Sequence, residues 1–288
     1  MAEYGLQLYS VSEDLARDFE GTLRSVAEIG FAHVELFGQP RSELRDALAS
    51  YGLECRSAHT SMPELLANAE GIIAFAAELD ARYLVCSAPW MRDASRLTAD
   101  PTLEPFATFF SAVAALTLDD WKWNAEQLNR FGEQAHAAGL QLAYHNHNFE
   151  FREFGGVPAY ERLLESTDAD LVKMELDCGW ACIAGRDPAA YIRGNADRIR
   201  LLHVRDFEPG FKPTTVLTMT SPELLGPATP AVIGTGVVDY PDVLAAAREG
   251  SIDACFVERD PFWKGMPMLE AVRRDYESLR GLVGSNVS

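Results

Sequence analysis

The sequence predicts a single-domain (β/α)8 barrel, a TIM barrel, that spans residues 1–288, and three observations support this prediction. Short segments rich in β-branched and aromatic residues alternate with amphipathic helical segments, and eight such pairs fill the chain. Strands joined by helical crossovers pair in parallel. The segment after the first strand, Tyr9-Ser-Val-Ser-Glu13, contains no glycine. An open doubly wound sheet usually carries a glycine-rich phosphate loop there, so the closed barrel is favoured.

The expected strands and helices are bounded by ordinary start and stop signals. Gly30, Gly52 and Gly139 are expected to end helices, Ser42 to cap one and Pro158 to lie in a first turn. The strands are expected over residues 5–10, 33–37, 53–58, 83–87, 140–145, 172–177, 199–203 and 254–258. The helices are expected over residues 19–29, 42–51, 63–79, 121–138, 158–166, 188–195, 240–248 and 268–282.

Two connections are longer than the rest and interrupt this alternation. Residues 89–120 follow the fourth strand and residues 207–239 follow the seventh. In a barrel of this type the connections that follow strands lie on the catalytic face. We interpret both as extended loops that cover a substrate, with neutral surface decoration as the alternative.

Composition restricts the classes of partner. The formal net charge of -18 and the absence of a Lys/Arg cluster argue against nucleic acid, which is bound through basic side chains. No apolar run is long enough for a membrane span, and the first residues do not resemble a signal peptide. The five cysteines are odd in number and form no CxxC, so reduced thiols that pack in the core of a cytoplasmic protein are expected. A small, neutral or weakly charged substrate fits this composition.

Four neighbouring strands each place a histidine or a carboxylate at the same end. These residues are His145, Asp177, His203 and Glu258, at the ends of the fifth to eighth expected strands. Because parallel strands emerge at one rim of the barrel, the four side chains are expected to converge. Converged carboxylates repel one another unless a cation lies between them. Imidazole together with carboxylate suits one divalent ion, for which we expect Mn²⁺, with Mg²⁺, Co²⁺ and Zn²⁺ as alternatives.

Several motifs at these strand ends resemble the xylose isomerase-like barrel superfamily, in its sugar phosphate isomerase/epimerase branch. The resemblance covers the whole chain. Three of its motifs, 175–180, 202–206 and 256–260, align Asp177, His203 and Glu258 with metal-binding positions of the family. The other two are 30–38 and 143–150. The resemblance implies a metal-dependent enzyme of carbohydrate metabolism, and it specifies the substrate poorly.

One departure from the family pattern bears on the reaction. Family epimerases commonly carry a glutamate where this chain has His145, so the second carboxylate base of an epimerase is missing. The form of residues 144–151 resembles members that act on keto-sugars by elimination, which requires one base and one acid. In such enzymes the metal polarises the carbonyl and stabilises an enediolate. His145 is then either a metal ligand or the base, and Glu258, His147 and Glu150 are the other catalytic candidates.

The expected function is β-elimination on a 3-keto-glycoside or a related keto-sugar without a phosphate group. The alternative is a sugar isomerase or epimerase, such as a ketose 3-epimerase or an aldose–ketose isomerase. More distant alternatives are a non-catalytic subunit and an endonuclease for abasic DNA. For the oligomeric state, the sequence allows a homo-oligomer as well as a monomer. Expected substrate contacts are His59, Trp180, Arg205, Glu35 and Trp90, and for each of them a structural role is the alternative.

Overall fold

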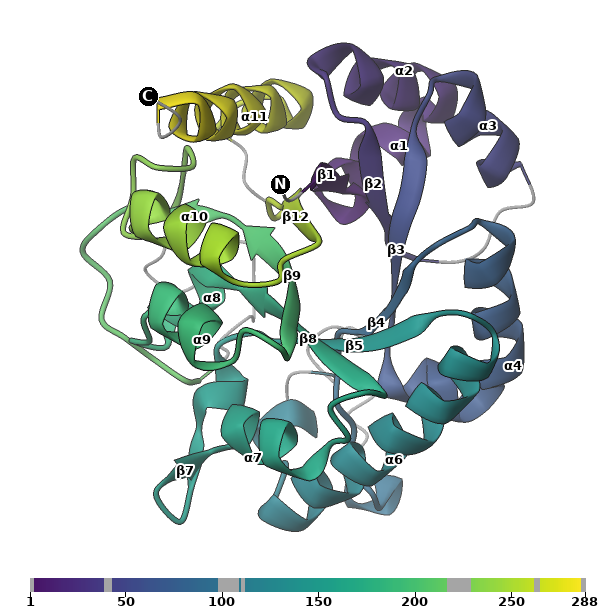
Figure 1. Ribbon diagram of the computed structural model, residues 1–288, viewed down its shortest axis with the longest axis vertical. Helices are drawn as coiled ribbons and strands as arrows, with labels where there is room; N and C mark the ends of the chain where they lie inside the picture. The colour runs from purple at the N-terminus through teal and green to yellow at the C-terminus, as the bar shows by residue number, and fades with distance from the viewer. Residues whose placement is uncertain are drawn as a thin grey trace.

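The computed structural model shows a closed barrel of eight parallel strands surrounded by helices (Figure 1). It describes residues 3–38, 43–97, 109, 112–216, 229–261 and 265–285. The strand order around the barrel is β1-β12-β9-β8-β5-β4-β3-β2, which confirms the predicted fold class. The barrel strands are β1 (Glu3–Gln7), β2 (His33–Leu36), β3 (Glu54–Thr60), β4 (Tyr83–Cys86), β5 (Gln141–His145), β8 (Val172–Asp177), β9 (Ile199–Val204) and β12 (Ala254–Val257).

The middle of the barrel is filled by side chains. One layer is apolar and buried, and consists of Tyr83, Val85, Ala143, Leu201, Ala254 and Phe256. Gly5 on β1 makes room for this layer, because a Cβ there would lie 2.7 Å from the ring of Phe256. Filled layers of this kind make the barrel a packed core, and they leave the carboxyl ends of the strands to carry chemistry.

Two of the long helices that cover the barrel begin at a capping box. Ser61 and Glu64 form a reciprocal capping box at the start of α4, and Thr117 and Asp120 form another at the start of α6. The helices are α1 (Ser12–Arg17), α2 (Phe19–Ile29), α3 (Leu44–Ser50), α4 (Met62–Glu78), α6 (Leu118–Ala137), α7 (Ala159–Ser166), α8 (Cys178–Ile183), α9 (Pro188–Gly194), α10 (Tyr240–Glu249) and α11 (Met268–Ser285).

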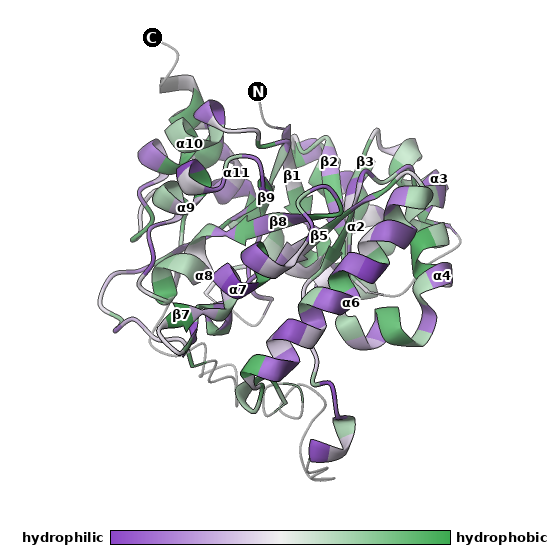
Figure 2. Ribbon diagram, turned by 60° about the horizontal axis from the view of Figure 1, so that its bottom comes forward, coloured by the Kyte–Doolittle hydropathy of each residue, from purple (hydrophilic) through white to green (hydrophobic). Residues whose placement is uncertain are grey.

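These helices are amphipathic. Figure 2 shows hydrophilic and hydrophobic residues alternating along α6, whose buried residues recur every three or four positions. The five cysteines are free, and four of them are buried, as expected for thiols that pack in a core. Among the helices that the structure describes, none combines the length and the apolar character that a membrane span would need.

The observed boundaries correct the sequence prediction at several places. Strand β1 ends at Gln7 rather than at residue 10, because the Gln7 side chain accepts the N–H of Tyr9 and starts a 3₁₀ turn over Leu8–Val11. Helix α6 begins three residues early, at its capping box. Helices α1 and α8 were not predicted. The expected cap Ser42 lies outside the described residues.

The long connection after β9 contains a short hairpin, β10 (Asp206–Phe207) with β11 (Pro230–Ala231). Asp206 holds this connection in place, since its two carboxylate oxygens accept the backbone N–H groups of Phe207, Gly234, Gly236 and Val238 at 2.9–3.0 Å. Gly236 is required at this point, because a Cβ there would lie 2.3 Å from the Phe207 carbonyl oxygen. Residues 98–108, 110–111 and 217–228 of the two long loops lie outside the described residues.

Replacing Asp206 with alanine is expected to destabilise the protein by about 3 kcal/mol or more, because several backbone N–H groups lose their acceptor. The free energy of unfolding, measured by urea denaturation, tests this. Asp197→Ala is the matched control, because Asp197 is exposed and its loss is expected to cost less than about 0.5 kcal/mol. Equal stability of the two variants would contradict the role given to Asp206.

Candidate metal centre and active site

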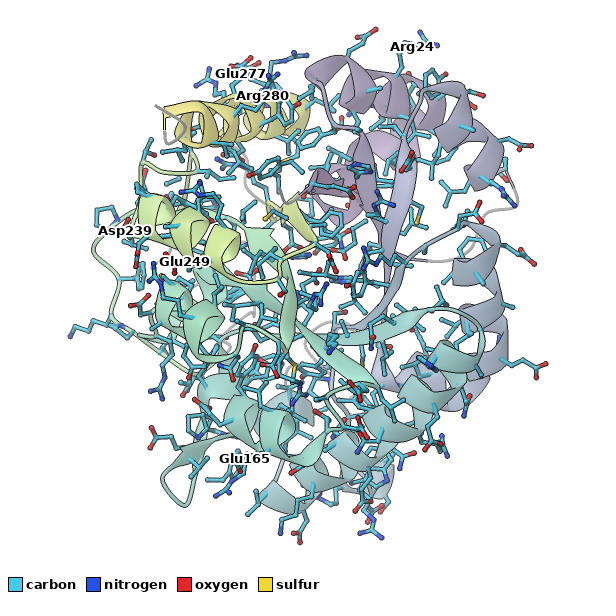
Figure 3. All side chains as sticks on the ribbon, in the orientation of Figure 1. Arg24, Glu165, Asp239, Glu249, Glu277 and Arg280 are labelled. Atoms are coloured by element: carbon cyan, nitrogen blue, oxygen red, sulfur yellow. The ribbon has the colours of Figure 1, made fainter. Side chains whose placement is uncertain are left out.

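A cavity of about 290 Å³ opens at the carboxyl ends of the barrel strands. Figure 3 shows polar side chains gathered inside the ring of strands, whereas its labelled charged residues lie on the outer ring. The lining comes from strand ends, from the segments that follow them and from α4 and α8: Tyr9, Phe37, Gly38, His59, Thr60, Ser61, Glu64, Ser87, Ala88, Phe109, His145, His147, Trp180, Arg205, Glu258 and Asp260.

The four predicted metal ligands come together beside this cavity. One donor atom from each of His145, Asp177, His203 and Glu258 lies within 4.8 Å of the others, and all four residues are buried. We call this set the outer cluster. Asp177 Oδ1 accepts the N–H of Trp180 at 2.7 Å, and this bond starts α8 directly after β8. Asp177 Oδ2 is buried and has no hydrogen-bond partner among the described residues. An orphaned carboxylate oxygen in such a set fits a cation.

Arg205 places a guanidinium against the acids of the outer cluster. Its guanidinium lies 2.9 Å from Glu258 Oε2, 3.4 Å from Asp260 Oδ2 and 3.6 Å from Asp177 Oδ2. It also lies over the Trp180 ring, 5.4 Å from its centre. Gly179 permits this packing, because a Cβ there would lie 2.5 Å from Arg205 Cγ. Arg205 therefore lines the cavity and partly neutralises its acids.

Burial and the neighbouring charges together set the pKa values of the outer cluster. Burial raises the pKa of Asp177 to about 6. Burial also opposes the charge of Glu258, but Arg205 and His203 outweigh it and lower the pKa of Glu258 to about 2. Burial and the neighbouring His203 lower the pKa of His145 well below its usual range, which leaves this ring neutral at pH 7. A neutral imidazole can ligate a metal or accept a proton.

A second group of polar side chains lies under the outer cluster. Glu175 Oε2 lies 2.9 Å from His59 Nε2, 3.0 Å from His145 Nδ1 and 3.2 Å from His203 Nε2. We call His59, His145, Glu175 and His203 the inner cluster; one donor atom from each again lies within 4.8 Å of the others. Glu35 Oε2 closes it on one side, 3.0 Å from His59 Nε2 and 2.5 Å from His203 Nε2.

Close contact between carboxylates and imidazoles shifts the pKa values of the inner cluster. Burial and the neighbouring Glu35 raise the pKa of Glu175 to about 7. Burial lowers the pKa of His59, but the two carboxylates outweigh it and raise that pKa to about 9. Gln7 Nε2 donates to Glu35 Oε2 at 2.8 Å, which ties the start of the barrel to this cluster.

The two remaining catalytic candidates differ in their surroundings. His147 lines the cavity, with its ring stacked on Phe149. Glu150 is fully buried behind it, where one oxygen accepts the Tyr144 hydroxyl at 2.9 Å and the other accepts the N–H of His147 at 2.7 Å. The geometry therefore gives Glu150 a positioning contact and leaves His147 facing the cavity.

The predicted substrate contacts divide in the same way. His59, Trp180 and Arg205 line the cavity, although Trp180 is only 5% exposed. Glu35 lies under the cavity, in contact with His59 and His203. Trp90 packs against the barrel core, and its backbone N–H and carbonyl both bond to Asn124, so in the described structure it is not a lining residue. Its expected substrate contact stays a prediction.

Sequence reasoning missed Glu175, which touches three histidines. The available signal was strand periodicity, because Glu175 lies two residues before Asp177 on β8 and so points to the same side of the sheet. A carboxylate at that position in a barrel strand points into the lumen, where it requires a partner.

Three known proteins resemble this chain over most of its length. A curated relative, inosose dehydratase from Geobacillus kaustophilus (strain HTA426), is 26% identical over 264 residues, which are 83% of this chain and 80% of that protein. A sugar phosphate isomerase/epimerase structure from Parabacteroides distasonis ATCC 8503 superposes with a TM-score of 0.72 at 23% identity, over 97% of this chain and 94% of that one. The apo structure of 3-keto-D-glucoside 4-epimerase from E. coli superposes with a TM-score of 0.66 at 17% identity, over 98% and 100%.

A match to a protein family covers most of the chain. Residues 23–280 match the family described as Xylose isomerase-like TIM barrel, which includes all eight strand ends except that of β1. The strand order of the barrel agrees with this match. The chain belongs to the xylose isomerase-like TIM barrel family.

Proposed function

We propose that this protein is a divalent-metal-dependent carbohydrate lyase, which removes the proton next to the carbonyl of a cyclic keto-sugar and expels the group β to that carbonyl. The observation that supports it most is the outer cluster, in which two histidines and two carboxylates meet beside a cavity. One curated relative that matches most of the chain is named inosose dehydratase, and loss of water is an elimination of the same class.

The outer cluster would hold the ion. His145, Asp177, His203 and Glu258 supply two nitrogen donors and two carboxylates, and Asp177 Oδ2 has no other partner in the described residues. This mixed set fits Mn²⁺, Zn²⁺ or Co²⁺, and Mn²⁺ is the ion we propose. When bound, a divalent ion would supply Lewis acidity that lowers the cost of negative charge on the substrate carbonyl oxygen.

The base would be His147, because His145 belongs to the donor set and Glu150 is engaged behind the ring. Glu150 accepts the backbone N–H of His147 and so fixes where this ring stands. The proton leaves the carbon next to the carbonyl as the carbon–oxygen bond at the β position breaks, and a double bond forms between the two carbons. The leaving oxygen needs a proton. Tyr9 lines the cavity, and since burial raises its pKa, its hydroxyl keeps a proton to donate at neutral pH.

The remaining lining favours a sugar without a phosphate group. Among the described residues, Glu64, Glu258 and Asp260 line the cavity together with one guanidinium, that of Arg205. Arg205 is already paired with carboxylates, so a phosphate dianion would meet more negative than positive charge. The flat ring of Trp180 offers an apolar surface to a neutral sugar.

The test is incubation of the purified protein with an inosose and with a 3-keto-glycoside in deuterated water, with Mn²⁺ and with a chelator. We expect loss of water or of the aglycone alcohol, with an unsaturated ketone as product, only when the metal is present. Deuterium incorporation with inversion and without loss of a group would show epimerisation instead. Turnover of neither substrate, or turnover that the chelator does not affect, would overturn the proposal.

Metal binding is expected to weaken as the pH falls, most steeply below about 6, because two ligands must lose a proton before they can ligate: Asp177, whose pKa burial raises to about 6, and His203, whose pKa burial opposes but the neighbouring carboxylates raise. Below that pH each unit is expected to cost roughly tenfold in affinity for each protonated ligand. Competition titrations with an indicator chelator between about pH 5 and pH 8 measure this. The Asp177→Asn variant, which lacks one of the two titrating groups, serves as the control. An affinity that stays constant over this range would contradict the assignment of Asp177.

A further inference from the structure

We propose that the inner cluster is a second, imidazole-rich metal site, which takes Zn²⁺ and competes with the outer cluster for the same two histidines. Its donors are His59 Nε2, His145 Nδ1, His203 Nε2 and Glu175 Oε2. The inference rests on the outer cluster as the metal site of the proposed function, and it adds a second position for an ion in the same barrel.

The geometry of the inner cluster is that of a closed four-ligand site. Three ring nitrogens lie 2.9–3.2 Å from one carboxylate oxygen, and each donor belongs to a residue that is buried or nearly so. Neighbouring donors of a tetrahedral zinc ion are about 3.3 Å apart when the ligand bonds are about 2.0 Å long. The three printed distances to Glu175 Oε2 are close to this value, and the ring nitrogens lie within 4.8 Å of one another, so they would have to draw together around an ion.

The inner carboxylates also lack partners for half of their oxygens. Glu35 Oε1 and Glu175 Oε1 are buried, and neither accepts a hydrogen bond from any residue that the structure describes. The connected cluster contains more negative than positive side chains, with Arg205 as its guanidinium. Its buried carboxylates are Glu35, Glu175, Asp177, Glu258 and Asp260.

The two sites exclude one another because they use opposite nitrogens of the same ring. His203 points Nδ1 at Glu258, 2.9 Å away, and Nε2 at Glu35 and Glu175. A neutral imidazole has one nitrogen lone pair and one N–H. When Nδ1 ligates at the outer cluster, Nε2–H donates to Glu35. When Nε2 ligates at the inner cluster, Nδ1–H donates to Glu258. The tautomer of His203 thus follows the position of the ion.

The donor sets differ in the ion they prefer. The outer cluster offers two carboxylates and two imidazoles, whereas the inner cluster offers three imidazoles and one carboxylate. Imidazole nitrogen suits Zn²⁺, and carboxylate oxygen suits Mn²⁺ and Mg²⁺. Zn²⁺ is therefore expected to occupy the inner cluster and, by taking His145 and His203, to inhibit the metal-dependent reaction.

The experiment compares Zn²⁺ and Mn²⁺ binding to the metal-stripped protein and two variants. His59→Phe removes a donor of the inner cluster alone and keeps a planar ring, and Asp177→Asn removes a donor of the outer cluster alone. We expect His59→Phe to weaken Zn²⁺ binding by on the order of tenfold or more while Mn²⁺ affinity changes little, and Asp177→Asn to do the reverse. Equal effects of His59→Phe on the two ions would overturn the inference.

Two further measurements keep the test decisive if His59→Phe folds poorly, as circular dichroism would reveal. Anomalous scattering from Zn²⁺-soaked wild-type crystals is expected to place the ion about 2.0–2.1 Å from His59 Nε2. Zn²⁺ at the outer cluster instead would sink the inference. So would simultaneous binding of one Zn²⁺ and one Mn²⁺ per chain. Either failure leaves Mn²⁺-dependent turnover intact, so it is distinguishable from failure of the proposed function.

Discussion

Asp177→Asn is expected to weaken Mn²⁺ binding by on the order of 100-fold or more and to remove metal-dependent turnover at micromolar metal. Loss of a contact that only supports a ligand already costs roughly 10- to 100-fold in affinity, and loss of an anionic ligand itself costs at least as much. Asparagine can still accept the N–H of Trp180 through Oδ1, so α8 keeps its cap. The substitution therefore removes the charge that faces the outer cluster without removing the local structure.

Calorimetric titration of metal-stripped protein with Mn²⁺ measures this effect, with turnover followed at several metal concentrations. Asp197→Asn is the matched control, because it makes the same chemical change at an exposed position. Partial recovery of turnover at high metal would agree with a weakened site. Wild-type affinity in Asp177→Asn would mean that the ion sits elsewhere, and the proposed function would lose its main support.

The sequence predicted the outer cluster because its members stand at strand ends. Parallel strands in a closed barrel share one rim, so a histidine or carboxylate that ends a strand is placed by topology alone. The end of β1 was harder to predict, since the bond from the Tyr9 N–H to the Gln7 side chain stops the strand within an otherwise β-rich run. Helix α8 was missed because its six residues follow β8 directly, and so short a segment shows no helical period.

The inner cluster could not be assembled from the sequence. Its contacts join β2, β3, β5, β8 and β9, and they depend on how far each side chain reaches into the lumen. Glu35 pairs with Ser57, two residues before His59, and this pairing depends on a shift of register between Val34 and Glu35 that the sequence does not reveal. Sequence periodicity gives the side of a strand but not its height in the barrel. Which nitrogen of each ring faces which carboxylate is visible only in the folded chain.

His147→Asn is expected to lower kcat by roughly 10²- to 10⁴-fold with little change in Mn²⁺ affinity, since the loss of a general base typically costs this much. His145→Asn is instead expected to lower Mn²⁺ affinity, because His145 belongs to the outer cluster. Single-turnover rates at saturating metal, combined with metal titrations of both variants, separate the two roles. His136→Asn, on the exposed side of α6, is the control for the substitution itself.

Comparing the His145→Asn and His147→Asn variants answers the question that the sequence left open, whether His145 is a metal ligand or the base. Its Nδ1 lies 3.0 Å from Glu175, so its other nitrogen is the one available to the outer cluster or to a substrate. If His145 is a metal ligand, turnover of His145→Asn is expected to recover as the metal concentration rises. If His145 is the base, turnover is expected to stay low at any metal concentration. If His145→Asn keeps full metal affinity and loses kcat, while His147→Asn keeps its rate, then His145 is the base and the ion is held by Asp177, His203 and Glu258. The elimination would still need only one base, but the proton would be removed beside the metal, and Glu175 behind His145 would then orient the base.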